Sequence, residues 1–335
     1  MNLLKIKLLA NIKILILLLL LSSTTAAACD ICGCFMGLTP YDNQSNFGIL
    51  YRYRSFNGYH GQNHATFPRG SNFFIPKDDR TAPLTGHNNN PADYELYRTM
   101  EVRGRYFLHQ RIELNAIVPY NSNSERYNGY TTSISGIGDV NLYAGYHLIR
   151  KLDQAKFNQR LIVGAGIKLP SGKNDVKTVT GIRYSALMQP GTGSTDGFVY
   201  ANYLIGIKKF GMSINSSYKI NGQNAAQEGI ANSSTTFLNL FYTQRINKDW
   251  QVTPSAQFFY ENSAGETYKG VKTGEHQMNN LMAGIGADLY YKNIALNLGF
   301  QRNVWEAKTD HPQSAAKVYV GITYNINQLY YLIKS

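Results

Sequence analysis

The sequence has little charge, little tryptophan and almost no long apolar runs. Charged residues make up 16% of its 335 positions, whereas an ordinary soluble domain has about 25%. Its single long apolar run lies at the N-terminus, which excludes a bundle of membrane-spanning helices. Neither a Gly-x-Ser-x-Gly elbow nor a His-Glu-x-x-His zinc motif occurs, so we do not expect an enzyme. Tyrosine and glycine, by contrast, are abundant at 25 and 30 residues, and this composition excludes a disordered chain.

The apolar run at the N-terminus has the features of a secretory signal peptide. Lys5, Lys7 and Lys13 precede an uncharged core over residues 14–21, and the small residues Ala26-Ala27-Ala28 follow it. A membrane anchor is the alternative, but the uncharged core is shorter than a bilayer span. We therefore predict that residues 1–28 are cleaved and that the mature protein is exported. Loss of the three lysines lowers the formal charge from +12 to +9.

Downstream of residue 28, apolar and polar residues alternate in one segment after another. This period of two places each apolar set on one face of a β-strand. The clearest apolar sets are Phe47, Ile49, Tyr51 and Tyr53; Ile112, Leu114, Ala116 and Val118; and Leu142, Ala144, Tyr146 and Leu148. The sequence contains about twelve such strands of roughly ten residues, the length that a tilted strand needs to cross a bilayer. Within them, Pro254 predicts a bulge or a strand end, and residues 197–207 are apolar on both faces.

The connections between the expected strands alternate between short and long. Short connections lie near residues 109–110, 151–158, 209–211, 247–249 and 291–293. Long polar connections lie at residues 58–93, 121–136, 170–196, 222–234, 262–276 and 303–316. Periplasmic turns and long external loops are typical of an outer-membrane barrel, whereas a soluble β-sandwich has no reason to separate the two kinds of connection. We predict an all-β fold: a transmembrane, antiparallel up-and-down barrel over residues 46–335, preceded by a periplasmic cysteine-rich segment over residues 29–45.

The residues that alternate with these apolar sets lie on the opposite face of each strand. Many of them are charged, and we expect them to line the barrel lumen. The residues assigned to the lumen are Arg52, Arg54, Glu101, Arg103, Arg105, Glu113, Asp139, Lys168 and Lys219. Such a lumen is either a water-filled pore or a narrow barrel closed by salt bridges, since a barrel of this size supports both. The basic excess favours small polar or anionic solutes as partners. Outer-membrane lipids and the barrel-assembly machinery are the other expected partners, and nucleic acid is not expected.

All three cysteines lie in Cys29-Asp30-Ile31-Cys32-Gly33-Cys34, directly after the predicted cleavage site. Cys29, Cys32 and Cys34 could together coordinate copper or zinc. A local disulfide with one thiol left over and acylation of Cys29 are the alternatives. Five histidines fall in the expected external loops, where they could share a metal, although polar loops collect histidine in any case. They are His60, His64, His87, His276 and His311.

Several motifs resemble those of a family of outer-membrane transporters. They are Gly136-Ile137-Gly138-Asp139-Val140, the segment over residues 164–172, and Gln189-Pro190-Gly191-Thr192-Gly193-Ser194. The family is often labelled transporter or phenol-degradation meta-pathway protein, and the cysteine motif and residues 51–56 look like its Bacteroidetes-type members. The resemblance runs from Cys29 to about Tyr324 and implies an outer-membrane barrel with an uptake or channel role. It brings no catalytic residues with it, and Ser171 stands where the family more usually has threonine.

A passive or gated outer-membrane channel is therefore the leading hypothesis for the function. The alternative is a periplasmic metal-binding or metal-sensing barrel that uses the cysteine segment and does not transport. A barrel enzyme or a structural envelope protein is the third possibility. Stoichiometric copper or zinc would favour the second hypothesis over the first, and a closed lumen would favour the third.

Overall fold

The structure, a computed structural model, describes residues 44–59, 93–127, 130–151, 157–178, 181, 183–184, 186–272, 277–307 and 312–326. The expected signal peptide and the three cysteines lie outside these ranges. The strands are β1 (Ser45–Tyr59), β2 (Tyr94–His109), β3 (Ile112–Tyr127), β4 (Tyr130–Ile137), β5 (Val140–Lys151), β6 (Phe157–Leu169), β7 (Asp196–Ile207), β8 (Phe210–Ile220), β9 (Glu228–Ile230), β10 (Ser233–Tyr242), β11 (Gln244–Arg245), β12 (Trp250–Ser263), β13 (Glu266–Tyr268), β14 (Val271–Lys272), β15 (Met278–Tyr291), β16 (Ile294–Glu306) and β17 (Pro312–Ile326).

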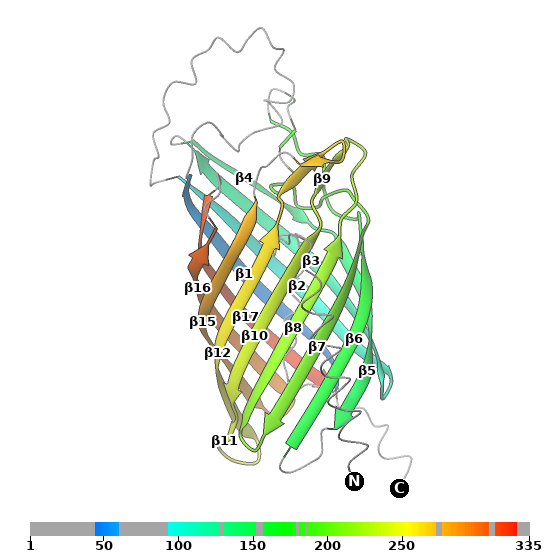
Figure 1. The fold of residues 1–335 in the computed structure, drawn as a ribbon, viewed down its shortest axis with the longest axis vertical. Helices are drawn as coiled ribbons and strands as arrows, with labels where there is room; N and C mark the ends of the chain where they lie inside the picture. The colour runs from blue at the N-terminus through cyan, green and yellow to red at the C-terminus, as the bar shows by residue number, and fades with distance from the viewer. Residues whose placement is uncertain are drawn as a thin grey trace, which may run out of the picture.

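These strands form a closed, 12-stranded antiparallel barrel, which confirms the predicted fold class. The strands run obliquely to the long axis of the molecule (Figure 1). The ring closes where β1 pairs with β17. β4 and β5 are successive parts of one barrel strand, because both pair with β3, and β11 continues β10 alongside β12. Closure removes the sheet edges, so the backbone groups of the strands find partners without water, as the hydrocarbon core of a membrane requires.

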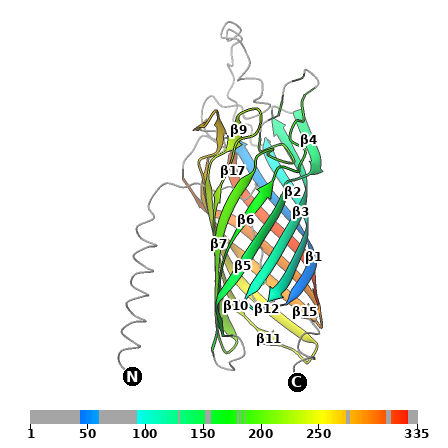
Figure 2. The same cartoon turned by 90° about the vertical axis from the view of Figure 1, so that its right-hand side faces the viewer.

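The two ends of the barrel differ in the length of their connections. Tight turns join β2 to β3, β7 to β8, β11 to β12 and β15 to β16 at one end, which faces the periplasm in an outer-membrane barrel. The opposite, loop end carries a small sheet of β9, β13 and β14 (Figure 2). In the described part of the chain, no helix is long and apolar enough to span a membrane.

The prediction of a long loop over residues 121–136 is wrong, because these residues belong to a β-hairpin. β3 continues to Tyr127, and β4 pairs with it over most of this stretch. The outward-facing residues Thr131, Ser133 and Ser135 of β4 are small and polar. The sequence therefore lacks the apolar alternation that marks the other strands, although the backbone ladder is complete.

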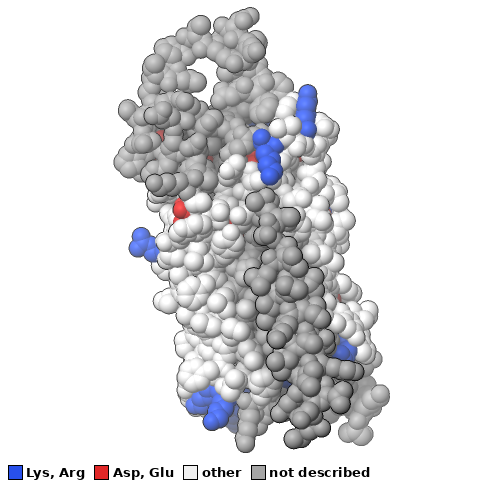
Figure 3. Space-filling view, viewed as in Figure 1, with Lys and Arg blue, Asp and Glu red and all other residues white. Residues whose placement is uncertain are grey.

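Side chains alternate between the inside of the barrel and its outer surface, as the period of two predicts. Along β2, for example, buried and more exposed residues follow one another over most of the strand. Large apolar side chains such as Ile49, Val102 and Leu114 are exposed on the outside. Lysine and arginine lie mainly toward the two ends of the face shown in Figure 3. An apolar band between charged ends is the surface that a bilayer requires.

Residues 197–207, whose facing the sequence leaves open, form most of β7. Tyr200 and Leu204 are buried inside the barrel, whereas Val199 and Ile207 are exposed. The Tyr200 ring packs on the Tyr143 ring, with centroids 5.7 Å apart. This strand is apolar on both faces because it contributes to an aromatic cluster in the interior as well as to the outer surface.

Pro254 was expected at a bulge or a strand end, and it is at neither. It lies within β12, which pairs with β15 through this position without a shift in register. On its other side, the ladder from β10 ends at Phe241 opposite Ser255 and resumes in β11 at Gln244 opposite Val252. Proline has no backbone N–H, so a central strand accommodates it where the neighbouring ladder is interrupted.

Candidate functional site

The candidate site is the polar interior of the barrel, which contains all of the side chains assigned to the lumen. They are Arg52 and Arg54 on β1; Glu101, Arg103 and Arg105 on β2; Glu113 on β3; Asp139 between β4 and β5; Lys168 on β6; and Lys219 on β8. All are buried except Arg103, which is half-buried. A buried charge is unfavourable unless it is paired, so the partners of these groups decide what the interior can do.

Glu101 is the centre of a first group of charges, halfway along β2. Its carboxylate accepts hydrogen bonds from Nη2 of Arg52 and from Nη2 of Arg103. Nε of Arg103 also donates to the same carboxylate, at 2.6 Å. Two guanidinium groups therefore share one carboxylate, and the three side chains together carry a positive charge.

Glu113 is the centre of a second group, nearer the periplasmic turns. Its Oε2 lies 3.2 Å from Nε2 of His147 and 3.9 Å from Nε of Arg105. Nδ2 of Asn115 and the hydroxyl of Tyr200 donate to Oε1, at 3.3 and 3.4 Å. Glu113 and His147 are fully buried. One carboxylate thus organises polar groups from four different strands.

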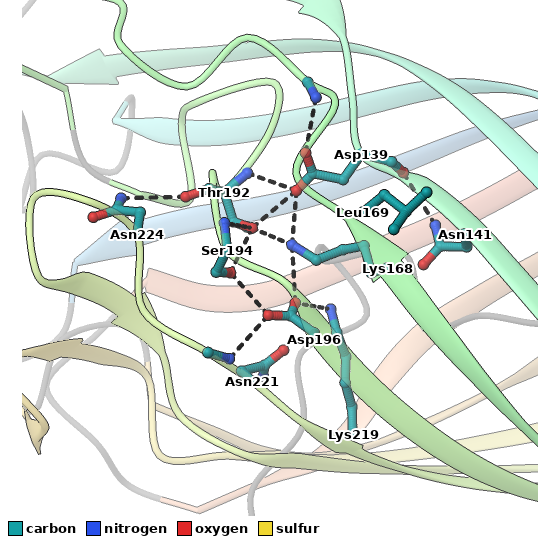
Figure 4. Close-up of polar contacts among 12 residues, drawn as sticks. Asp139, Asn141, Lys168, Leu169, Thr192, Ser194, Asp196, Lys219, Asn221 and Asn224 are labelled. Atoms are coloured by element: carbon teal, nitrogen blue, oxygen red, sulfur yellow. Dashed lines mark hydrogen bonds and ion pairs between the residues drawn. The ribbon is translucent and has the colours of Figure 1, made fainter.

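Asp139 and Asp196 organise a third group at the loop end of the barrel (Figure 4). Nζ of Lys168 lies 2.7 Å from Oδ2 of Asp139 and 2.8 Å from Oδ2 of Asp196. Nζ of Lys219 lies 3.1 Å from Oδ2 of Asp196. Two carboxylates and two ammonium groups balance one another, and all four side chains are buried. A neutral chain of ion pairs therefore runs along the wall near the mouth of the barrel, over the neighbouring strands β5 to β8.

Asp139 also anchors the loop between β6 and β7. The backbone N–H of Gly172 donates to its Oδ1 at 2.9 Å, and the backbone N–H of Thr192 donates to its Oδ2 at 2.8 Å (Figure 4). A Cβ on Gly191 would lie 2.7 Å from Cα of Gly172, so both positions need glycine where the two backbones cross. The three motifs that carry the family resemblance therefore meet in space around one carboxylate.

Residues 186–191 of this loop are buried in the mouth of the barrel. Nδ2 of Asn123 donates to the carbonyl of Met188 at 3.1 Å, and Nδ2 of Asn121 donates to the carbonyl of Pro190 at 2.6 Å. Aliphatic side chains of the segment join hydrophobic clusters with the surrounding strands. We call residues 186–191 the mouth segment. It lies across the entrance of the lumen and is held from below by β3.

The wall formed by β10, β12, β15 and β16 is different, because nearly all of its buried polar side chains are neutral. They are Ser233, Thr235, Asn239, Thr253, Gln257, Ser263, Asn280, Asn297 and Gln301, and Glu261 is the charged one among the described residues. Nε2 of Gln257 donates to the Tyr319 hydroxyl at 2.6 Å, and its Oε1 accepts from Gln301 at 2.9 Å. We call this the amide wall, and we call the wall of β1 to β7 the charged wall.

Side chains fill much of the interior and leave small cavities. One cavity, of about 40 Å³, lies beneath the mouth segment and is lined in part by Arg52, Asn141 and Lys168. A second, of about 50 Å³, includes Arg105 and Asn297 in its lining. A single water needs at least about 10–15 Å³ of such space, so each cavity has room for a few waters. The interior is closer to the narrow, salt-bridged alternative than to a wide pore.

Sequence reasoning missed several charged residues of the interior because the expected strands were too short. Alternation predicts strands over residues 252–260 and 318–326, so Glu261 and Lys317 each lie one residue beyond an expected strand, yet both are buried inside the barrel. Glu261 accepts a hydrogen bond from Arg54, and Nζ of Lys317 lies 3.5 Å above the ring of Phe259. Arg160 is also buried, and it shares the parity that placed Lys168 inside. Extending the alternation of each expected strand by one or two residues would have placed these side chains inside the barrel.

The proposed copper or zinc ligands Cys29, Cys32 and Cys34 lie outside the described residues, as do the five loop histidines His60, His64, His87, His276 and His311. Within the described ranges, no group of three histidine, cysteine, aspartate or glutamate side chains is arranged to hold a metal ion. A metal at the cysteine segment remains a prediction from the sequence.

Comparisons with known proteins agree with this architecture. A family model described as "Putative MetA-pathway of phenol degradation" matches residues 76–319. An outer membrane channel from Pseudomonas putida is similar in structure, with a TM-score of 0.61 and 12% identity over 86% of this chain and 100% of that chain. The β domain of the Bordetella autotransporter BrkA gives a TM-score of 0.45 and 10% identity over 84% of this chain and 100% of that chain. No curated protein matches the sequence significantly. The fold is that of a bacterial outer-membrane barrel.

Proposed function

The chain belongs to the family described as "Putative MetA-pathway of phenol degradation", and on that premise we propose that it is an outer-membrane channel for small polar or anionic solutes. The similar barrel from Pseudomonas putida is an outer membrane channel, but its 12% sequence identity to this chain supports only the fold. The side chains of the barrel interior must therefore support the proposal. The solutes would move through the lumen between the charged wall and the amide wall.

The observation that carries this proposal is the series of polar groups along the whole interior. It begins with Arg105 and Glu113 near the periplasmic turns, continues with Arg52 and Glu101, and ends with Lys168 at the mouth. A barrel that only had to fold would be more stable with apolar side chains inside, because each buried ion pair has a desolvation penalty. Paired groups at successive depths give an entering anion a new cationic partner at each step.

The family description also suggests which solutes to test. It names phenol degradation, and the barrel interior contains an aromatic cluster that includes Tyr143 and Tyr200. The Tyr200 hydroxyl donates to Glu113, so an aromatic surface and charged groups lie together in this region. A small aromatic compound with a hydroxyl or carboxylate group would contact both. Benzoate and phenol are therefore the probes, with acetate as the anion that lacks a ring.

Conductance across planar bilayers tests the proposal. We expect the purified barrel to conduct and to prefer anions in a salt gradient, because the group around Glu101 is positive. Arg52→Gln should lower the ratio of anion to cation permeability by about twofold or more, and Arg52→Lys should keep the ratio near the wild-type value. The matched control is Arg98→Gln on β2. It removes an arginine on the outer face of the barrel, whose Nη2 donates a hydrogen bond of 3.3 Å to Ser124.

Solute flux gives the second measurement, in liposomes loaded with a dye that reports uptake. Benzoate entry above the rate of empty liposomes would agree with the proposal, and equal entry of benzoate and acetate would show that the ring adds nothing. A folded protein that neither conducts nor passes any of these solutes would refute the channel and leave only the barrel.

A further inference from the structure

Basic side chains are concentrated on three neighbouring hairpin turns at the periplasmic end. Lys208 and Lys209 form the turn between β7 and β8. Arg245 ends β11, Lys248 lies in the turn between β11 and β12, and Lys292 lies in the turn between β15 and β16. These turns are neighbours around the ring, because β8 pairs with β10 and β12 pairs with β15. Figure 3 shows basic surface at the lower end of the molecule, near the position of β11 in Figure 1.

Two of these turns enclose a recess of about 370 Å³ at the periplasmic mouth of the lumen. Its lining includes Arg245, Lys248 and Lys292, together with Asp249 as the acid of the described lining. Three cationic side chains and one carboxylate give the recess a net charge of +2. The remaining lining is rich in amide side chains such as Asn247, which supply further hydrogen-bond donors.

The turns that carry the three cations are tied together by their backbones. The N–H of Lys292 donates to the carbonyl of Asp249 at 3.0 Å and so joins the two turns. Oδ1 of Asn247 accepts from the N–H groups of Asp249 and Trp250, both at 2.9 Å, which fixes the turn around Lys248. A positive φ of 50° at Lys292 is typical of a tight hairpin turn. The charges are thus presented by a rigid frame.

Among the described residues, the cations of the recess have no acidic partners of the kind that the interior cations have. Arg52, Lys168 and Lys219 each form an ion pair inside the barrel. In the described part of the chain, by contrast, no ion pair joins Arg245, Lys248 or Lys292 to a carboxylate. The Lys292 ammonium lies 5.2 Å from the centre of the Tyr291 ring, a contact that leaves its charge uncompensated. Like charges gathered in one recess repel one another until an anion enters.

We propose that this recess at the periplasmic mouth binds a phosphate group. A phosphate carries up to two charges and several acceptor oxygens, which matches three cations and the nearby amide donors. The group could come from free phosphate in the periplasm or from the headgroup of a phospholipid in the periplasmic leaflet. Trp250 and Tyr291, whose ring centroids lie 4.6 Å apart beside the recess, are exposed at the depth where lipid headgroups meet water. The site requires the recess alone, so it does not depend on conduction through the lumen.

Two binding measurements on the full-length barrel distinguish these sources. The first is calorimetric titration of the protein in a neutral detergent with inorganic phosphate. The second is flotation of the same protein with vesicles of phosphatidylcholine that contain or lack phosphatidylglycerol. We expect one or both probes to bind, with an affinity that falls as salt increases because the cations are exposed.

The decisive variant replaces Arg245, Lys248 and Lys292 with glutamine, and its control is Lys208→Gln on the adjacent turn. Lys208 does not line the recess, so its loss removes a charge from the same end without changing the site. The triple variant should bind about tenfold more weakly or worse, and the control should remain within about twofold of wild type. Circular dichroism and resistance to heat in detergent verify that each variant is folded.

The outcomes separate the sources and can overturn the proposal. If the triple variant loses binding of inorganic phosphate but not of phosphatidylglycerol vesicles, free phosphate is the ligand. Loss confined to phosphatidylglycerol vesicles identifies the lipid headgroup. If neither probe binds to the wild type, or if the triple variant binds as tightly as the Lys208→Gln control, the recess is not a phosphate site.

Discussion

The charged wall and the amide wall face the same lumen but meet the problem of buried polarity in different ways. On the charged wall, single carboxylates such as Glu101 and Glu113 each hold more than one partner. On the amide wall, Gln257 and Gln301 form a neutral hydrogen bond of 2.9 Å. Changing one member of a neutral pair is less destabilising than removing one charge of a buried ion pair, because the second change leaves a charged partner buried and uncompensated. Selectivity and stability should therefore both be more sensitive on the charged wall.

Replacing Glu113 should give the largest loss of stability. Glu113→Gln keeps the size of the side chain but removes the charge that faces Arg105 and His147, at 3.9 and 3.2 Å. Breaking a buried ion pair from one side lowers the free energy of unfolding by about 3–5 kcal/mol. Urea-induced unfolding in lipid vesicles, followed by tryptophan fluorescence, measures the change. A loss no larger than that of a neutral substitution on the amide wall would contradict the proposed difference between the walls.

Replacing Asp139 should open the mouth without unfolding the barrel. Asp139→Asn keeps one acceptor oxygen but directs an amide toward the backbone N–H groups or toward Lys168, so the anchor of the mouth segment is weakened. The loss of one or two such hydrogen bonds is about 1–3 kcal/mol, which corresponds to an open fraction that rises by about fivefold or more. Single-channel recording measures the open fraction.

A matched control for this experiment lies in the same loop. Asp175→Asn changes an exposed aspartate, which pairs at 3.1 Å with the exposed Lys177 and lies 3.7 Å from Nε of Arg183. Exposed pairs contribute between about 0 and 1 kcal/mol, so gating should not change. Equal conductance of wild type and Asp139→Asn would mean that the mouth segment does not control entry.

The contrast between the walls also shows how far the sequence leads. Alternation predicts that Arg52, Glu101 and Lys168 point inward, because parity depends only on the pleat of a strand, and all three side chains are buried. It could not show that Lys168 bridges Asp139 and Asp196, since those residues come together only when β6 pairs with β5 on one side and with β7 on the other. The amide wall was overlooked entirely, because asparagine, glutamine and serine on the inner parity look like ordinary solvated residues in a sequence.

Substitution of Gln257 should lower the stability less than Glu113→Gln and, unlike Arg52→Gln, should leave the ion selectivity unchanged. Gln257→Leu removes a donor to the Tyr319 hydroxyl and an acceptor for Gln301. The two partners are neutral, so the free energy of unfolding should fall by about 1–3 kcal/mol. The ratio of anion to cation permeability should stay at the wild-type value, because no charge changes. A shift in selectivity as large as that of Arg52→Gln would remove the distinction between the two walls.

The smallest effect is expected outside the lumen, in the small sheet at the loop end. Burial raises the pKa of Glu228 on β9 above its ordinary value of 4.5, and the nearby Arg183, at 2.7 Å, only partly opposes this rise. The folded protein therefore holds the proton more tightly than the unfolded chain. The corresponding stability is complete below pH 4.5 and is lost as the pH rises through the folded-state pKa.

Glu228→Gln tests this sign directly, because glutamine cannot ionise. The variant should be slightly more stable than wild type at pH 7, by less than about 1 kcal/mol, and the difference should disappear as the pH falls below the ordinary carboxyl range. Melting temperatures of the two proteins, measured side by side across that pH range, give the difference. If the variant were less stable at neutral pH, the ion pair with Arg183 would outweigh the burial of Glu228. The loop end would then resemble the charged wall, where ion pairs with cationic side chains stabilise the buried carboxylates.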